Sequence, residues 1–510
     1  MTRRILVLGL FCALLIFGAA AGSHAAEIES FAVGMPADAK AIDPHQSVDN
    51  YSFAVLKHIN QPLVTMDGKT KELVPILAEK WEILDPETYK FYLKKGVKFH
   101  NGDELTAEDV VFSFKRMMND PKSFYTKSRG KYLDPDGFQI IDKYTVIVKT
   151  NGPLPIWLSG MRHPYANILS KRAVEEAGDD YFRNPVGTGA YKFKSWVKGE
   201  KIELERFDDY HGKKANIKNL TFLIIPDASS RVIALETGKV DLIYEVPGND
   251  VERLNASSKT KVVESQGLIL HHLFLNTKKK PMDDPRVRKA IEYAVNKEAY
   301  GHVVYQGLFT TPVGPILPVS SFTPKDAKPY PYDPAKAKEL LKEAGYPDGF
   351  NAELWIANFA DRVSGATVLQ SMLAEVGVKV KITVYESGVF DGLGKDPGYD
   401  MAIRTVGMQT ARDAGDYWNS MLHSTSVGGY NWSQLSDPEL DKMIEEANAE
   451  MDPAKREVML QAAWEKIDEL HPDVALSIPS ELYGARKDLV GLENLGDGRQ
   501  NYLGDLTLQQ

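Results

Sequence analysis

The chain has 510 residues and a formal net charge of −9. A chain of this length serves two or three domains of ordinary size. An acidic chain without a long basic run is a poor partner for nucleic acid, which we therefore exclude as a ligand. The single cysteine, Cys12, lies in the N-terminal apolar segment, so the rest of the chain lacks disulfides, cysteine nucleophiles and thiolate metal sites.

Residues 1–25 have the pattern of a secretory signal peptide. Two arginines precede an apolar run over 5–21, and small residues follow it, so we expect cleavage after Ala25. The run is short and no charged stop follows it, which favours a signal over a membrane anchor. Phe11 precedes Cys12 where a lipoprotein site needs a small residue. We expect an exported, periplasmic protein that is not a lipoprotein.

Strand and helix signals alternate along the mature chain. Alternating apolar residues over 88–94 predict a strand, and a helix capped by Thr106 follows after a turn. Residues 138–150 predict a hairpin. Four later helices begin at Asp-Pro pairs, in which the carboxylate caps the helix and proline occupies its first position. These pairs are Asp284-Pro285, Asp333-Pro334, Asp437-Pro438 and Asp452-Pro453.

Between residues 352 and 405 the order is strand, helix, strand, short helix, strand. This repeated βαβ pattern predicts mixed sheets covered by helices, and hence an α/β fold of at least two lobes. No low-complexity linker separates the lobes, so we expect them to share short crossings. Ligands of such sheets sit beyond the carboxyl ends of the strands, which directs attention to the loops near Asn358 and Gly407.

Common catalytic motifs are absent from the sequence, including the nucleophile elbow, the zinc-binding helix and the phosphate loop. His271 and His272 are adjacent in a predicted strand, so their side chains point to opposite faces and cannot share a metal. The glycines at 187–189 are followed by strand-like alternation, which indicates a turn. We expect no enzymatic activity and no cofactor; a secreted hydrolase with a triad assembled from distant residues is the alternative.

The segment 404–418 is the richest in recognition chemistry. It combines guanidinium, carboxylate, carboxamide and aromatic groups directly after a predicted buried strand. We predict a ligand-binding loop in which an arginine binds a carboxylate, an acid binds a cationic group and aromatic rings form apolar walls. A loop whose charges pair with one another is the alternative. The candidates are Arg404, Gln409, Arg412, Asp413, Asp416 and Trp418, with Tyr51, Asn358 and Trp355 added, although Trp355 could equally belong to the core.

Several segments carry a family pattern. Leu-Ala-Glu-Lys-Trp-Glu-Ile at 77–83 is followed by Tyr-Lys-Phe-Tyr-Leu-Lys-Lys-Gly-Val-Lys-Phe-His-Asn-Gly-Asp at 89–103 and by Leu-Thr-Ala-Glu-Asp-Val-Val-Phe-Ser-Phe-Lys-Arg-Met at 105–117. This pattern closely resembles the family 5 extracellular solute-binding proteins, the receptors of peptide and nickel importers. Further matches at 184–193, 234–242, 284–291 and 332–346 extend the resemblance over nearly all of the mature chain.

The resemblance implies a two-lobed, periplasmic-binding-protein-like fold that closes like a hinge on its ligand and serves the permease subunits of an ABC importer. Lobe one would comprise residues 26–275 and 485–510, with an extra subdomain inserted at about 52–170, and lobe two residues 276–484. We expect a monomer that binds a peptide or peptide-like compound. Glutathione, an opine, an oligosaccharide or a nickel chelate are alternative ligands, and a sensory ligand-binding protein would have the same sequence features.

The chain departs from the family at the ligand loop. Peptide-binding members carry a tryptophan where this chain has Val406, and an aspartate for the peptide's amino terminus where it has Gln409. A carboxamide cannot replace that ion pair, so either Asp413 or Asp416 assumes the role or the ligand has no ammonium there. In dipeptide receptors an arginine in the loop after the first strand of lobe two binds the carboxylate, and Arg362 lies near that place without aligning to it.

Overall fold

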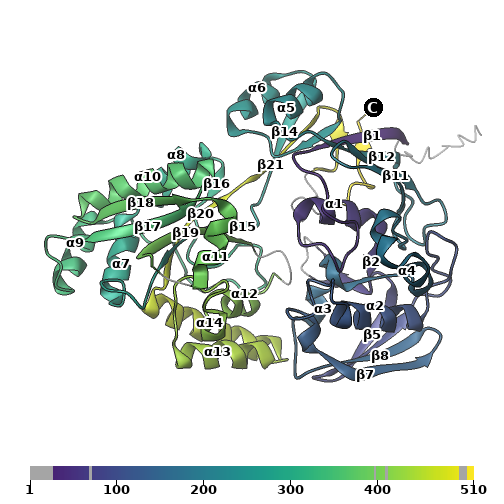
Figure 1. Cartoon of the computed structure of the whole chain (residues 1–510), viewed down its shortest axis with the longest axis horizontal. Helices are drawn as coiled ribbons and strands as arrows, with labels where there is room; N and C mark the ends of the chain where they lie inside the picture. The colour runs from purple at the N-terminus through teal and green to yellow at the C-terminus, as the bar shows by residue number, and fades with distance from the viewer. Residues whose placement is uncertain (1–26, 68–71, 396–397, 408–411, 493–501, 510) are drawn as a thin grey trace, which may run out of the picture.

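The structure is a computed structural model that describes residues 27–67, 72–395, 398–407, 412–492 and 502–509. Figure 1 shows two lobes joined at one end, with an additional subdomain extending from the first lobe. The predicted two-lobed α/β architecture is confirmed, because each lobe contains its own mixed sheet covered by helices.

Lobe one is built on a seven-stranded sheet. Its central strand β1 pairs in parallel with β12 and β13, and β21 returns from late in the chain to lie antiparallel between β13 and β14. In spatial order the strands are β10 (Tyr191–Val197), β11 (Lys201–Arg206), β12 (Ile217–Ile224), β1 (Ile28–Met35), β13 (Leu242–Tyr244), β21 (Glu481–Arg486) and β14 (Thr260–Ser265). The helices are α1 (Asn50–Ile59), α5 (Ala228–Glu236) and α6 (Val251–Ala256), and β22 (Leu489–Val490) pairs with β23 (Thr507–Leu508).

The inserted subdomain has a four-stranded antiparallel sheet and its own hydrophobic core. In spatial order its strands are β5 (Ala78–Asp85), β6 (Thr88–Leu93), β8 (Thr145–Thr150) and β7 (Leu133–Asp142), so the predicted hairpin is confirmed. The predicted capping box at Thr106 starts α2, the longest helix of the subdomain. The remaining elements are α2 (Ala107–Asn119), α3 (Trp157–Gly160), α4 (Lys171–Ala177), β2 (Gln61–Pro62), β3 (Val64–Met66), β4 (Leu73–Pro75) and β9 (Asn167–Ile168).

Lobe two is built on a six-stranded sheet whose two faces are covered by separate hydrophobic clusters. In spatial order the strands are β16 (Phe309–Thr310), β20 (Asp473–Pro479), β15 (Ile269–Leu275), β19 (Met401–Gly407), β17 (Asn351–Ala357) and β18 (Lys379–Tyr385). Strand β17 is parallel to both β18 and β19, which confirms the predicted βαβ units.

Four helices of lobe two begin at the Asp-Pro pairs. Each of the four Asp-Pro aspartates accepts a backbone hydrogen bond at the start of its helix, as predicted. The helices are α7 (Pro285–Ala294), α8 (Lys297–Tyr305), α9 (Pro334–Glu343), α10 (Ala360–Glu375), α11 (Ser387–Gly392), α12 (Ala414–Met421), α13 (Pro438–Ala449) and α14 (Pro453–Leu470).

Two short crossings join the lobes. One lies at residues 266–268 between β14 and β15, and the other at Ser480 between β20 and β21. The expected boundaries at 275 and 484 therefore shift, because β15 forms the centre of the lobe-two sheet while β21 pairs with β13 and β14 of lobe one. The crossings touch: a Cβ on Gly267 would lie 2.0 Å from the Pro479 carbonyl oxygen, so this position requires glycine.

Candidate functional site

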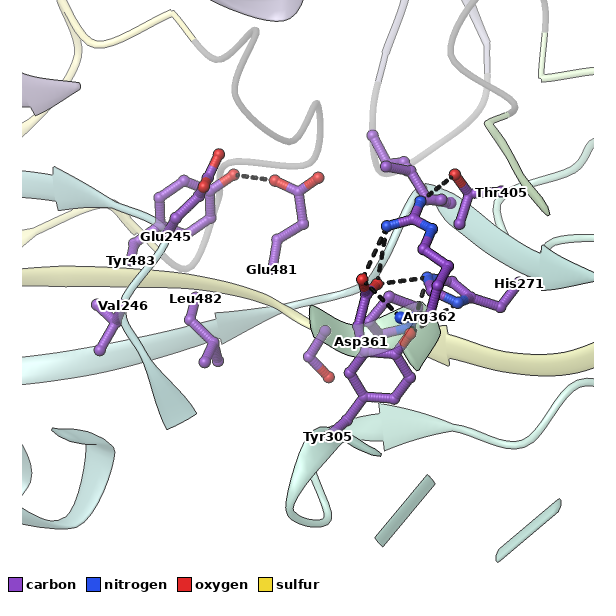
Figure 2. Close-up of a pocket in the computed structure, with 14 residues that line it drawn as sticks. Glu245, Val246, His271, Tyr305, Asp361, Arg362, Thr405, Glu481, Leu482 and Tyr483 are labelled. Atoms are coloured by element: carbon purple, nitrogen blue, oxygen red, sulfur yellow. Dashed lines mark hydrogen bonds and ion pairs between the residues drawn. The ribbon is translucent and has the colours of Figure 1, made fainter. Parts of the chain in front are cut away.

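A cavity of about 300 Å³ lies at the hinge, with walls from both lobes and both crossings (Figure 2). A second cavity of about 280 Å³ lies within lobe one, beside Tyr210 and Tyr502, and does not reach lobe two. Because the hinge cavity, unlike the second one, touches both lobes, it is a place where a bound molecule would change their relative position. Its polar wall residues are Glu245, Glu481, Ser480 and Tyr483 on one side and His271, Tyr305, Asp361, Arg362 and Thr405 on the other.

Glu245 comes from lobe one and is held in an unusual backbone conformation directly after β13. Its φ of 58° is in the left-handed region, which costs a non-glycine residue of order 1–3 kcal/mol. The carbonyl oxygens of Tyr244 and Glu245 accept hydrogen bonds from the Arg231 guanidinium at 3.3 and 3.2 Å. The Tyr51 hydroxyl donates to Glu245 Oε1 at 2.6 Å, so the surrounding structure fixes both backbone and carboxylate.

Glu481 stands at the second crossing, where β21 begins. Its Oε2 accepts a hydrogen bond from the Tyr483 hydroxyl at 3.2 Å, and both residues line the cavity. The preceding Ser480 hydroxyl donates to the Glu264 carboxylate at the end of β14. Because Glu481 directly follows the crossing at Ser480, the distance between its carboxylate and lobe two depends on how far the lobes have closed.

Arg362 provides the cationic wall from lobe two. It lies in the first turn of α10, beyond the carboxyl end of β17, in the loop region that the sequence indicated. Its Nη1 donates to the two Asp361 oxygens at 2.9 and 3.0 Å, and its Nη2 donates to Thr405 Oγ1 on β19 at 2.7 Å. The Phe359 ring lies 4.6 Å from the guanidinium carbon. The guanidinium is therefore fixed in orientation before any ligand arrives.

His271 contributes no charge to this wall. Burial lowers its pKa well below the usual value, and the neighbouring Arg362 charge lowers it further. The Tyr305 hydroxyl lies 2.8 Å from the ring nitrogens of His271, and Asp361 lies 3.5 Å from its Nε2. With a neutral histidine, the cavity wall carries the three carboxylates of Glu245, Glu481 and Asp361 against one guanidinium. The field in the cavity thus favours a positively charged group.

His271 and His272 point to opposite faces of β15, as predicted. His272 is fully buried, and its Nε2 lies 2.8 Å from the Tyr417 hydroxyl while its Nδ1 meets the Asp473 carboxylate. Both histidines are therefore tied into the structure of lobe two. Within the described ranges no group of three or more histidine, cysteine, aspartate or glutamate side chains is placed to hold a metal ion.

Arg404 packs inside lobe two instead of in the cavity wall. Its guanidinium carbon lies 4.7 Å from the Trp432 ring centre and 5.6 Å from that of Tyr430, and Nη2 lies 3.1 Å from an oxygen of Asp391. Burial lowers the pKa of Arg404 from its usual value. These ring contacts and the Asp391 ion pair hold the half-buried Arg404 side chain within lobe two.

The residues around the start of α12 form an anchor for that helix. Asp413 accepts a hydrogen bond from the Asp416 backbone amide at 3.1 Å and receives two from Arg456, each at 2.7 Å. Arg412 is buried, and its carbonyl oxygen accepts a hydrogen bond from the backbone amide of Ser321 at 2.8 Å. In this structure Arg412 and Asp413 therefore lie outside the hinge-cavity wall.

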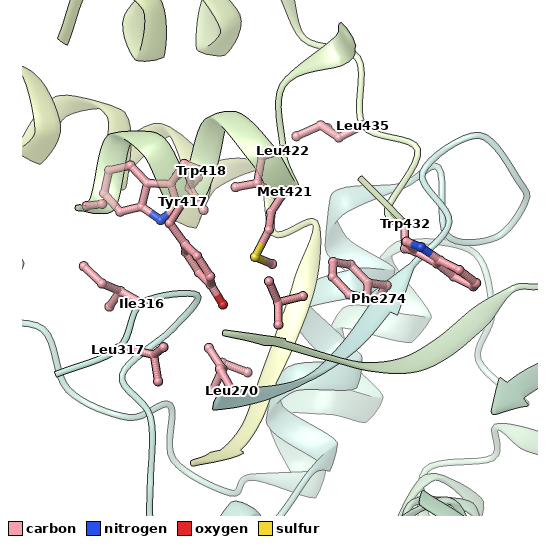
Figure 3. Close-up of a cluster of buried hydrophobic side chains, with 14 of the residues drawn as sticks. Leu270, Phe274, Ile316, Leu317, Tyr417, Trp418, Met421, Leu422, Trp432 and Leu435 are labelled. Carbon is pink, nitrogen blue, oxygen red and sulfur yellow. The ribbon is translucent and has the colours of Figure 1, made fainter. Parts of the chain in front are cut away.

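Trp418 is a core residue of lobe two. Its side chain is fully buried, and its Nε1 donates to the Pro315 carbonyl oxygen at 2.8 Å. Figure 3 shows Tyr417, Trp418 and Met421 of α12 packed in the cluster that also contains Leu270 of β15. A ligand could reach the Trp418 ring only if lobe two repacked, which corrects the expected role of this ring as a ligand-binding wall.

The remaining candidates are dispersed. Trp355 packs against the rings of Tyr385 and Tyr399, with centres 5.1 and 5.5 Å away. Asn358 is exposed, and Gln409 lies outside the described residues. Asp416 extends from α12 toward the inserted subdomain, where its carboxylate lies 3.4 Å from Arg129 Nη1.

Sequence reasoning thus found Arg362 and Tyr51 near the cavity but missed its carboxylates. Asp361 could have been chosen, because it adjoins Arg362 in a loop that the strand pattern indicated. Glu245 could have been suspected from its place between a short apolar strand and Val-Pro-Gly. Glu481 carries no local signal, since its role depends on the hinge passing through residue 480.

Comparisons with known proteins agree with the two-lobed fold. The model of the bacterial extracellular solute-binding proteins, family 5, matches residues 72–429. The glutathione-binding protein GsiB of Pectobacterium atrosepticum is 30% identical over 468 residues, covering 90% of each chain. The dipeptide-binding protein of Escherichia coli is 34% identical over 461 residues, covering 84% of this chain and 85% of the relative.

A solved structure shows the same fold. The periplasmic binding protein DppA of Helicobacter pylori, in complex with the peptide STSA, superposes with a TM-score of 0.80 at 30% identity. The match covers 95% of this chain and 99% of that protein. In the part of the chain that the structure describes, no helix is long and apolar enough to cross a membrane.

Proposed function

Because the chain belongs to family 5 of the bacterial extracellular solute-binding proteins, we propose that it captures a short zwitterionic peptide in the hinge cavity and delivers it to an ABC importer. Residues 1–25 direct export, and the mature protein works in the periplasm as a monomer. It binds without chemical conversion and meets the permease subunits in its closed form. The relatives, whose names record dipeptide and glutathione binding, support a peptide-like ligand.

The polarity of the cavity carries this proposal. Glu245 and Glu481 lie on the side of lobe one and the hinge, while Arg362 lies on the side of lobe two (Figure 2). A ligand ammonium therefore lies toward the two glutamates, and a ligand carboxylate binds the guanidinium that Thr405 and Asp361 already orient. Such a ligand touches both lobes at once only when they close, so binding stabilises the closed form.

The size and charge of the cavity favour a dipeptide over larger or more acidic ligands. A volume of about 300 Å³ is at the lower end of small-molecule sites, which span about 300–1,000 Å³. Glutathione carries an additional carboxylate, and this wall already has three carboxylates for one guanidinium. We therefore place glutathione and acidic opines below a neutral dipeptide in affinity.

Calorimetric titration with a dipeptide and its blocked analogues tests the proposal. The series contains alanyl-phenylalanine, its N-acetyl form, its C-terminal amide and glutathione. Losing one partner of a desolvated charge pair costs about 2–5 kcal/mol, so each blocked form should bind roughly 30-fold or more weakly. Recovery of intact dipeptide after incubation distinguishes binding from hydrolysis.

Variants assign each end of the ligand. Arg362→Ala should weaken the dipeptide but not its amide, and Glu245→Gln should weaken the dipeptide but not its N-acetyl form. Exposed Arg183 and Glu252 lie away from the cavity, so Arg183→Ala and Glu252→Gln serve as matched controls. Equal losses for free and blocked peptides in the cavity variants would overturn the assignment of the ligand's ends, and no binding of any peptide would exclude this ligand class.

A further inference from the structure

An ion pair joins the two lobes away from the hinge. Arg129 belongs to the inserted subdomain and Asp416 to α12 of lobe two, and Nη1 of the arginine lies 3.4 Å from Oδ1 of the aspartate. Figure 1 places α12 on the side of lobe two that faces the inserted subdomain, farther from β21 than the ends of β15 and β16 are. The hinge cavity and this pair therefore lie at different depths between the same two lobes.

Both partners are held in place before they meet. The Asp416 backbone amide donates to Asp413, whose carboxylate is fixed by Arg456. On the other side, the Arg129 amide donates to the Tyr125 carbonyl oxygen at 2.8 Å.

The Arg129 guanidinium carbon also lies 5.9 Å from the Tyr165 ring centre. The side chains of Arg129 and Asp416 are only 22% and 15% exposed, so water screens the pair weakly. Burial alone would lower the pKa of Arg129, yet the Asp416 carboxylate and nearby tyrosines raise it overall. The pair is thus a formed, partly desolvated contact between lobes and differs from a solvated surface bridge.

We propose that the Arg129–Asp416 pair is a clasp that limits ligand length. When the clasp is closed, a short ligand lies between it and the hinge, whereas a longer peptide has to pass between the lobes where the two side chains meet. Passage of the longer peptide separates Arg129 from Asp416 and leaves both charges unpaired and partly desolvated. The free-energy cost of this separation opposes binding of the longer ligand. This inference rests on the proposed function, because it concerns which peptides the same site accepts.

Clasp and hinge cavity have separate chemical roles. The polar ends of a dipeptide are bound by Glu245, Glu481 and Arg362, none of which touches the clasp. Removing the clasp should therefore leave dipeptide affinity within about threefold of its original value, because a dipeptide in the hinge cavity contacts neither Arg129 nor Asp416. A direct ligand role for Asp416, in which it binds the ammonium, predicts the opposite: a large loss for every peptide.

Affinities for a length series distinguish these outcomes. Alanine peptides of two, four and six residues are titrated against the unmodified protein, Asp416→Asn and Arg129→Gln. In the unmodified protein we expect the hexapeptide to bind at least about tenfold more weakly than the dipeptide, and in both variants we expect this difference to shrink to the preference that the small hinge cavity itself imposes. The control is Glu439→Gln, which removes a pair with Lys466 inside lobe two; it should keep the original length preference.

The possible failures are separable. If the unmodified protein binds no peptide, the proposed function fails together with the clasp. If it binds peptides and both variants keep its length preference, only the clasp is refuted. If Asp416→Asn loses dipeptide and hexapeptide binding equally while Arg129→Gln does not, Asp416 contacts the ligand and the clasp is also refuted. Unfolding curves for each variant verify that the folded protein is being titrated.

Discussion

Replacement of Asp413 tests whether the charged segment after β19 holds lobe two together. Asp413 is 4% exposed, and both of its oxygens accept hydrogen bonds from Arg456. Removing one partner of a buried ion pair costs about 3–5 kcal/mol, because the other charge stays buried and uncompensated. Asp413 also caps α12, and loss of a cap adds about 1 kcal/mol. Asp413→Ala should therefore destabilise lobe two by about 4–6 kcal/mol.

Urea unfolding monitored by tryptophan fluorescence measures this loss, since Trp418 is buried in the same helix. Asp413→Asn retains a capping group but no charge, so it should lose about 1 kcal/mol less than alanine. In Asp413→Ala combined with Arg456→Met the orphan charge is gone, and the double variant should be more stable than Asp413→Ala alone. A double variant that is less stable than either single one would refute the reasoning.

Three further predictions concern other parts of the chain. The ring of His100 donates through Nε2 to one carbonyl of the 187–189 turn and accepts an amide there through Nδ1, so folding requires the neutral ring and burial lowers its pKa to about 4. As pH falls from 6.5 toward 4, His100 takes up a proton in the unfolded chain but not in the folded protein, so the free energy of unfolding declines by about 1.4 kcal/mol per pH unit on its account. In urea unfolding at pH 7 and pH 5, His100→Gln should therefore lose less stability between the two pH values than the unmodified protein does. An equal loss in both proteins would contradict this prediction. In Gly267→Ala the new Cβ would meet the Pro479 carbonyl oxygen at 2.0 Å, so the crossings separate and calorimetry should show weaker dipeptide binding, whereas unchanged affinity would show that the crossings tolerate separation. Arg404→Ala should lower the urea midpoint but leave dipeptide affinity intact, because this side chain packs on a tryptophan outside the cavity; a large affinity loss would instead place it at the ligand.

Features with local causes were predictable from the sequence. The four Asp-Pro caps and the Thr106 capping box follow from hydrogen bonds that a side chain makes within three residues of itself. The βαβ order followed from apolar periodicity, which also directed attention to the loop that contains Arg362. The family resemblance added the two lobes, which periodicity alone does not specify.

The site itself depends on contacts between distant parts of the chain. The segment 404–418 was expected to bind ligand because it combines guanidinium, carboxylate, carboxamide and aromatic groups directly after a predicted buried strand, yet Asp413 pairs with Arg456 and Asp416 with Arg129. Conversely, Glu245 and Glu481 approach Arg362 only because the chain crosses between the lobes beside them. No spacing rule within one segment reveals such pairs.

Small-angle scattering with and without dipeptide tests most directly whether the two lobes close on a ligand at the hinge. Saturating dipeptide should reduce the radius of gyration of the unmodified protein, and Arg362→Ala at the same peptide concentration should keep the dimensions of the free form. An unchanged radius in a sample that calorimetry shows to be saturated would contradict closure around the hinge cavity.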